Sequence, residues 1–212
     1  MKKPILLIVV ASVLVFISAG CGHVLYADGP YHGKVIDKET KRPIEGAAVV
    51  AVWRKEAPAA HPIITIYDAQ EAVTDREGNF TVPGIVGGSV NPLAKIREPS
   101  FNIFKPGYAA YGETRESAMP RENDRILLAL GVLTTREQRV RNLSDVLFFS
   151  TCTPRELAER LEEKMRVAPP YCVPEEKIPN LLRLKKMEEY ELGLGTGNIF
   201  KGSRPLRKET PK

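Results

Sequence analysis

The chain has 212 residues, of which 43% are hydrophobic and 27% are charged. This composition is typical of a folded globular protein and excludes a wholly disordered chain. The formal net charge is +5, but much of it lies at the ends: Lys2 and Lys3 at the start, and five basic residues against one acidic residue in 195–212. The rest is close to neutral, so the charge gives no indication of a nucleic-acid-binding face.

Residues 1–20 have the three parts of an export signal. Lys2 and Lys3 form a basic start, residues 5–17 are almost entirely apolar, and small residues at 18–20 lead to Cys21. The apolar run is too short to span a bilayer comfortably, which favours a cleaved signal peptide over a membrane span. One interpretation is an ordinary signal peptide followed by an incidental cysteine.

The sequence Ser18-Ala19-Gly20-Cys21 resembles a bacterial lipobox. The resemblance implies that Cys21 is the lipidation site, that a dedicated peptidase removes residues 1–20, and that acyl chains such as palmitate anchor the mature protein. We therefore expect an exported protein that is lipid-anchored to a bacterial membrane. The residue after the cysteine is Gly22 and not Asp. By the same resemblance, this implies that the protein is sorted to the outer membrane, facing the periplasm, if the cell is Gram-negative. Residues 21–30 are expected to be a lipidated tether.

Residues 31–131 contain short β-branched and aromatic stretches separated by turn signals, a pattern typical of a β-sandwich. Turns are predicted at 41–43, 75–78 and 105–107, where Pro and Gly gather, and a flexible loop at 84–92. Strands are predicted at 31–37, 47–54, 63–74, 79–82, 94–96, 101–105, 108–111 and 125–130.

Four segments of this region resemble the carboxypeptidase regulatory-like domain family. They are Gly33-Lys34-Val35-Ile36-Asp37, Pro43-Ile44-Glu45-Gly46-Ala47-Ala48-Val49, Thr74-Asp75-Arg76-Glu77-Gly78-Asn79-Phe80 and Lys105-Pro106-Gly107-Tyr108. The resemblance implies a seven-stranded antiparallel β-sandwich of the transthyretin-like kind. It also implies a structural or binding role, because the family has no catalytic residues of its own.

After residue 131 the apolar spacing becomes helical, and residues 132–193 are predicted to form an extension of about three helices. The first begins with a capping box from Thr134 to Glu137, and the second with one from Thr153 to Glu156. The third covers about 179–192 and ends at Gly193. Its expected apolar positions are Leu181, Leu182, Met187 and Tyr190. The basic residues 194–212 are expected to be a flexible tail.

Two cysteines, Cys152 and Cys172, remain if Cys21 carries a lipid. An oxidising compartment favours their pairing. The helix predicted between them spans roughly 20 Å, and the extended residues after it cover a similar distance, so a disulfide between Cys152 and Cys172 is geometrically feasible. Two separate buried thiols are the alternative.

The sequence offers little catalytic chemistry. His23, His32 and His61 are its histidines, and none begins the His-x-x-Glu spacing of a zinc carboxypeptidase. No Gly-x-Ser-x-Gly segment is present. We therefore expect no enzyme activity, no metal site and no cofactor. The candidate binding surface is the end of the sandwich that carries residues 85–91 and an apolar loop near Trp53.

These observations favour a non-enzymatic, membrane-anchored envelope lipoprotein with a structural or binding β-sandwich. Its expected partners are the membrane, through the lipid on Cys21, and envelope proteins or cell-wall polymer, but not nucleic acid. A carbohydrate- or peptidoglycan-binding module is one alternative function, and a hydrolase of unknown type is another.

Overall fold

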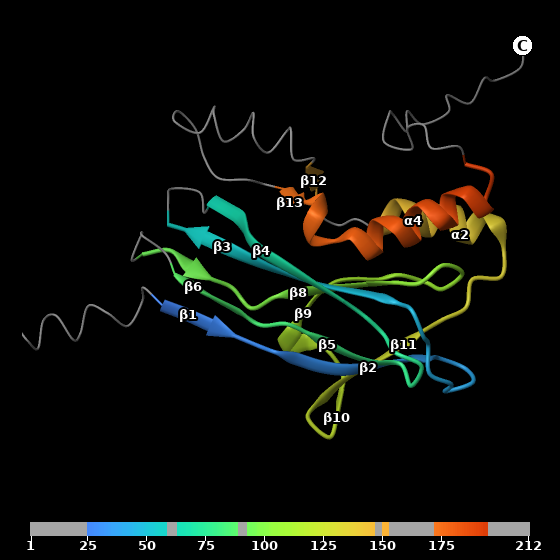
Figure 1. The fold of residues 1–212 in the computed structure, drawn as a ribbon, viewed down its shortest axis with the longest axis horizontal. Coiled ribbons are helices and arrows are strands. Elements are labelled where there is room, and N and C mark those ends of the chain that lie inside the picture. Colours follow the sequence, from blue (N-terminus) through green and yellow to red (C-terminus); the bar gives the residue numbers. More distant parts are fainter. Residues whose placement is uncertain (1–24, 59–62, 89–92, 147–149, 153–171, 195–212) are drawn as a thin grey trace, which may run out of the picture.

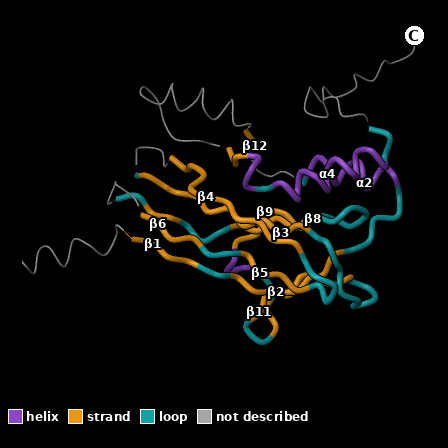
Figure 2. The backbone as a smooth tube through the Cα atoms, viewed as in Figure 1, coloured by secondary structure: helices purple, strands orange, loops and turns teal. Residues whose placement is uncertain are grey.

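The computed structural model describes residues 25–58, 63–88, 93–146, 150–152 and 172–194. Within these ranges the protein is mainly β, with two α-helices towards the end of the described chain. Figure 1 shows the two helices together on one side of the strands, and Figure 2 shows the same layering by type of element. The predicted signal peptide, the helix predicted after Thr153 and nearly all of the basic tail lie outside the described residues.

One main sheet has four strands in the order β10-β11-β2-β5. Their bounds are Tyr31–Asp37 for β2, Asn79–Val82 for β5, Arg121–Glu122 for β10 and Arg125–Leu130 for β11. Strand β11 runs parallel to β2, with Leu128 opposite Val35. The expectation of an entirely antiparallel sandwich is therefore wrong for this pair. The chain reaches β11 through a long connection, which is what a parallel neighbour requires.

Gly33 allows β2 to lie closely between its two neighbours. A Cβ atom at this position would lie 2.3 Å from the ring of Phe80 on β5 and 2.6 Å from the carbonyl oxygen of Ile126 on β11. No side chain fits at such distances, so the sheet depends on glycine here.

The second main sheet has five strands, with β4-β3-β8-β9 in order and β7 pairing with β3. Their bounds are Ala48–Ala57 for β3, Ile63–Val73 for β4, Lys95–Ile96 for β7, Ser100–Phe104 for β8 and Tyr111–Arg115 for β9. The first six residues of β3 are all buried. A continuous apolar run is what a strand covered on both faces requires.

The inner face of this sheet packs against the four-stranded sheet. Alternate residues of β3, namely Val49, Ala51 and Trp53, point into a core shared by both sheets. The other sheet contributes Val35 and Leu128 to the same core.

The outer face of the five-stranded sheet is covered by α2 (Arg136–Asp145) and α4 (Pro179–Glu191). The intervening residues of β3, Ala48, Val50 and Val52, form a second apolar cluster with residues of both helices. Short elements complete the described chain at η2 (Glu116–Ala118), β12 (Ser150–Cys152), β13 (Cys172–Pro174) and η3 (Glu175–Lys177), with β12 and β13 pairing in parallel.

Residues 25–28 form a strand, β1 (Leu25–Asp28), where a tether was expected. Strand β1 pairs antiparallel with β6 (Ile85–Gly88), which lies inside the predicted flexible loop. The expectation was wrong for both segments because the pairing partners are far apart in the sequence and each strand is short, so neither has a clear local pattern.

Two other local predictions are corrected. No strand forms at 108–110: Tyr108 makes an isolated bridge to Val132, and β9 begins at Tyr111, the last residue of the predicted strand. The first helix is capped by Thr135, not Thr134, and its capping box closes on Gln138 rather than Glu137. Gln138 replaces Glu137 because its side chain also accepts hydrogen bonds from the backbone amides of Thr134 and Thr135.

Candidate functional site

A cleft of about 810 Å³ opens where β3 changes its register with β4. Strand β4 has an extra residue, Tyr67, opposite the step from Trp53 to Arg54. The bulge separates the buried first part of β3 from its half-buried end. Six of the eight lining residues are charged or polar, and the other two are isoleucines. They are Arg54, Glu56, Ile64, Ile96, Arg97, Glu98, Ser100 and Arg115.

Hydrogen bonds orient the charged groups of this arginine cleft. Nη1 of Arg54 donates to the hydroxyl oxygen of the buried Ser100 at 2.5 Å. Nε of Arg97 donates to Oε2 of Glu56 at 2.7 Å. Arg115 projects from the neighbouring edge strand β9. Planar guanidinium donors suit a carboxylate or a phosphate, and Arg97 already pairs in this way with the carboxylate of Glu56.

The carboxylate of Asp28 joins three strands on the inner side of the fold. It accepts hydrogen bonds from the hydroxyl groups of Tyr31 at 2.5 Å and Tyr26 at 2.7 Å, and from the indole Nε1 of Trp53 at 2.8 Å. Burial alone would raise the pKa of Asp28, but the hydrogen bonds from Tyr31, Trp53 and Tyr26 outweigh it, so the pKa lies below its usual value. This Asp28 clamp fixes the end of β1 to the core.

The pKa values of the two tyrosines in the clamp shift in the opposite direction. Burial, followed by the adjacent Asp28 carboxylate, raises the pKa values of Tyr31 and Tyr26. Both hydroxyl groups are therefore donors across the physiological pH range. These shifts move all three pKa values away from neutral pH, so Asp28 stays charged, both tyrosines stay protonated, and the clamp is a structural contact.

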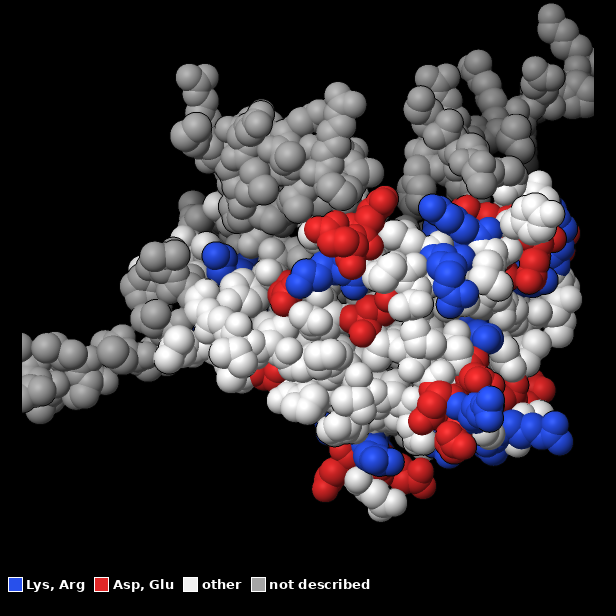
Figure 3. Space-filling model, in the orientation of Figure 1, with Lys and Arg blue, Asp and Glu red and all other residues white. Residues whose placement is uncertain are grey.

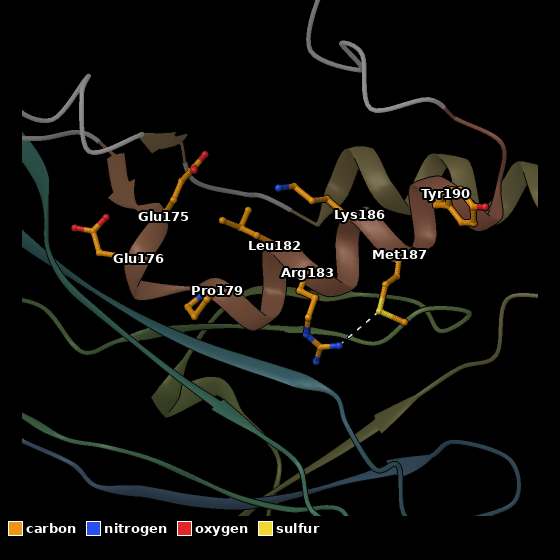
Figure 4. A pocket seen from close by; sticks show the side chains of 8 residues that line it. All are labelled: Glu175, Glu176, Pro179, Leu182, Arg183, Lys186, Met187 and Tyr190. Carbon is orange, nitrogen blue, oxygen red and sulfur yellow. Dashed lines mark hydrogen bonds between the residues drawn. The ribbon is translucent and has the colours of Figure 1, made fainter.

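A second concave surface, of about 680 Å³, lies on the outer side of α4. Figure 4 shows Leu182, Lys186 and Tyr190 projecting from successive turns of the helix, with Arg183 directed towards Met187. Nη1 of Arg183 lies 3.6 Å from the sulfur of Met187. This α4 groove combines exposed apolar surface with the charged side chains of Glu175, Glu176, Arg183 and Lys186.

The side of α4 that faces the molecule is unexpectedly polar. Glu188 is fully buried, and its two oxygens accept hydrogen bonds from Nε of Arg139 at 2.7 Å and from Nη2 of Arg139 at 2.5 Å. Nη2 also donates to Glu191 at 2.6 Å. The hydrogen bonds to Glu188 and then Glu191 raise the pKa of Arg139, which stays charged.

The structure changes the predicted apolar face of α4. Leu181 is buried as expected and Leu182 is half-buried, but Met187 and Tyr190 are exposed. The buried positions at the second half of the helix are Lys185, Glu188 and Glu189 instead. Lys185 and Glu189 form an ion pair one turn apart on the helix.

The predicted binding surface is corrected as well. Trp53 is fully buried within strand β3, so no apolar loop surrounds it. Residues 85–88 belong to β6, and residues 89–91 lie outside the described residues. The arginine cleft adjoins the predicted region in the sequence, since Arg54 follows Trp53 directly.

Of the cysteines, Cys21 lies outside the described residues. Cys172 is buried and takes part in a disulfide bond. Cys152 belongs to β12, the strand that pairs with β13, and Cys172 begins β13. The specific pairing of Cys152 with Cys172 stays a prediction.

Among the histidines, His32 is described, on β2, where its Nδ1 lies 3.0 Å from the hydroxyl oxygen of Thr81. His23 and His61 lie outside the described residues. Within the described ranges, no group of three or more His, Cys, Asp or Glu side chains is arranged to hold a metal ion. In the same ranges no helix is both long and apolar enough to cross a membrane.

Comparison with family models, with curated proteins and with solved structures gives no match to this chain. The site is therefore described by its own geometry. Sequence reasoning missed the arginine cleft because its arginines come from β3, from β9 and from the residue after β7, and show no local motif. It missed the Asp28 clamp because Asp28 was placed in a tether.

Proposed function

We propose that the protein is a non-enzymatic, membrane-anchored envelope lipoprotein whose folded body braces or binds a partner at the cell envelope. The observation that carries the proposal is the lipobox-like sequence ending at Cys21, with the folded body beginning only four residues later, at Leu25. A chain of that length holds the body close to the lipid. Several acyl chains on one cysteine give stable anchoring, because each buried methylene contributes about 0.8 kcal/mol.

We also propose that the two main sheets are a form of the seven-stranded, transthyretin-like sandwich of carboxypeptidase regulatory-like domains. Support comes from the number of longer strands, because seven strands of the two main sheets have four or more residues. They are β2, β3, β4, β5, β8, β9 and β11, whereas β7 and β10 have two residues each. The turns of the resembling segments also have the expected backbone, with positive φ at Gly78 and Gly107.

The anchor is tested by labelling cells with a radioactive or clickable palmitate analogue. The full-length chain should incorporate the label, and globomycin should block removal of residues 1–20. The Cys21→Ala variant should lose the label, while Cys152→Ala should keep it. An unlabelled wild-type chain, or a label that survives in Cys21→Ala, would reject the anchor.

Binding of cell-wall polymer is the second candidate, favoured by the arginine cleft. Cell-wall peptides carry carboxylates, and guanidinium groups pair with carboxylates by two parallel hydrogen bonds. The cleft has no aromatic side chain in its lining, so it lacks a platform for stacking sugar rings. The peptide part of the polymer is thus the better-suited ligand.

Sedimentation of the mature chain with purified cell wall tests this second candidate. Arg115→Gln should weaken co-sedimentation, because Arg115 lies in the cleft. Arg125→Gln is the matched control, since Arg125 is an exposed arginine at the start of β11. Equal binding by both variants would exclude the cleft as the ligand site. A hydrolase of unknown type remains an untested alternative, and screening the mature chain against hydrolase substrates addresses it.

A further inference from the structure

The outer face of the β1–β6 ribbon is apolar and exposed. Leu25 and Ala27 lie on the same face of β1, because alternate residues of a strand share a face. Val86 on β6 is paired with Ala27 and belongs to that face too. Leu25 is 81% exposed and Val86 is 87% exposed. The inner face carries Tyr26 and Asp28, which are held in the Asp28 clamp.

More exposed apolar residues occur at the same end of the molecule. Ile63 and Ile64 begin β4 and are 40% and 51% exposed. Ile63 pairs with Ala57, the last residue of β3, and the hydroxyl of Tyr67 on β4 donates to the carbonyl oxygen of Gly88 on β6. The start of β4 is thereby linked to the β1–β6 ribbon. We call Leu25, Ile63 and Val86 the apolar end.

Charges of both signs lie where β3 pairs with β7, since Lys95 on β7 pairs directly with Glu56. In Figure 3 the surface at the β1–β6 end carries few charged side chains, and most charged side chains gather farther along the molecule. An exposed apolar surface with few charges on it is typical of a protein face that contacts a membrane.

The place where the chain leaves the described structure identifies the occupant. Leu25 opens β1, and the start of β1 lies at this end of the molecule in Figure 1. Cys21 lies four residues before Leu25, so its Cα can be at most about 14 Å from that of Leu25. A lipid on Cys21 therefore keeps Leu25, and with it this end of the molecule, within about 14 Å of the lipidated residue.

We propose that the apolar end is a membrane-contact surface, which rests on a phospholipid bilayer and orients the folded body with the helices α2 and α4 away from it. The proposal rests on the proposed lipid anchor and adds to it. A flexible tether alone would leave the body free to tumble, whereas contact through the apolar end fixes which surfaces face the membrane.

The contact is tested by coupling the mature chain, residues 21–212, through Cys21 to maleimide lipids in phosphatidylcholine–phosphatidylglycerol vesicles. This display does not depend on lipidation in cells. A tryptophan probe is introduced as Val86→Trp or, as the matched control, as Tyr190→Trp, since Tyr190 is equally exposed but lies near the end of α4. Brominated phosphatidylcholine quenches tryptophan only where it touches lipid.

We expect the Val86→Trp chain to lose emission on brominated vesicles and to shift its emission to the blue. The Tyr190→Trp chain should match the wild type, whose Trp53 is buried. No quenching at position 86, or equal quenching at 86 and 190, would overturn the proposal.

A second measurement uses the Cys21→Ser chain, which has no anchor, and its partition onto the same vesicles. Leu25→Ser and Val86→Ser should each lower the partition coefficient roughly five- to tenfold, the loss expected for one well-exposed aliphatic side chain. Val132→Ser, at an exposed site away from this end, should leave it unchanged. Equal partition of all variants would also overturn the proposal. Failure of acyl labelling at Cys21, by contrast, rejects the anchor and leaves these vesicle results intact.

Discussion

The two faces of the five-stranded sheet are covered in different ways. On the inner face, Trp53 and Phe101 pack into a core made of apolar side chains from both main sheets. On the outer face, Val52 and Phe104 also lie in an apolar cluster, but that cluster is bordered by ion pairs and hydrogen bonds between the sheet and the helices. Burial of apolar area is not directional. The directional contacts of this polar border therefore fix the orientation of the helices on the sheet.

The border consists of contacts from separate parts of the chain. Glu71 on β4 accepts hydrogen bonds from the backbone amides of Asn180 and Leu181, which begin α4. The side chain of Asn142 on α2 donates to the carbonyl oxygen of Tyr108 and accepts from the amide of Ala110. Each contact has one geometry, so together they specify how α2 and α4 sit on the sheet.

The largest expected effects on stability come from two phenylalanines of β8, Phe101 and Phe104, which are buried on opposite faces of the sheet. Each change to Ala should lower the free energy of unfolding by about 3–5 kcal/mol. Phe101→Ala should speed amide hydrogen exchange in both sheets, whereas Phe104→Ala should speed it first in α2 and α4. Urea unfolding and hydrogen exchange measure the two effects. The same exchange pattern in both variants would mean that the helices and sheets unfold as one unit.

A smaller effect is expected at the buried ion pair of the outer layer. Glu188→Gln leaves Arg139, whose side chain is 25% exposed, without its main partner. The free energy of unfolding should fall by about 2–4 kcal/mol, less than for a fully buried pair. Glu191→Gln is the matched control, because Glu191 pairs with the same arginine but is exposed, and should cost under about 1 kcal/mol. Urea unfolding of both variants measures the difference, and equal losses would refute it.

This ion pair also shows what the sequence could predict and what it could not. Strands β2, β5 and β11 match their predicted bounds, because each has a local apolar pattern between clear turns. The end of α4 was also predicted from a local signal, Gly193, and this glycine has the positive φ that is typical after a helix. The burial of Glu188 was not predictable, because its partner lies on another helix and periodicity counts charged residues as exposed.

The candidate site was harder to predict than the fold for the same reason. Arg54, Arg97 and Arg115 belong to different parts of the chain and meet because β7 pairs with the end of β3 and β9 pairs with β8. The bulge that opens the cleft depends on one extra residue in β4. Neither feature has a spacing that a single sequence reveals.

The helix cap supplied by the sheet gives a third, smaller effect. Glu71→Gln removes the negative charge that faces the first amides of α4, where Ile178 cannot cap with its side chain. The free energy of unfolding should fall by about 1–2 kcal/mol. Glu45→Gln is a suitable control, since Glu45 is exposed and lies 3.9 Å from the exposed Arg76. Urea unfolding in which the two variants lose the same stability would show that Glu71 does not hold α4.

The smallest expected effect is at the Asp28 clamp, which is the polar contact of the inner side, and it depends on pH. The pKa of Asp28 in the folded chain lies below its usual value because three donated hydrogen bonds favour the carboxylate over the effect of burial. Stability from the clamp is therefore present above the unfolded pKa, about 3.9, and is lost as the pH falls through the lower folded value. Asp28→Asn should cost about 1 kcal/mol near pH 7, since the site is partly exposed, and the gap from the wild type should narrow below pH 4. Urea midpoints between pH 7 and pH 3 measure it, with Asp124→Asn, in the exposed turn before β11, as control. A gap that stays constant with pH would mean that the Asp28 carboxylate is not what secures β1, and the polar contacts would then matter only on the helix-covered side.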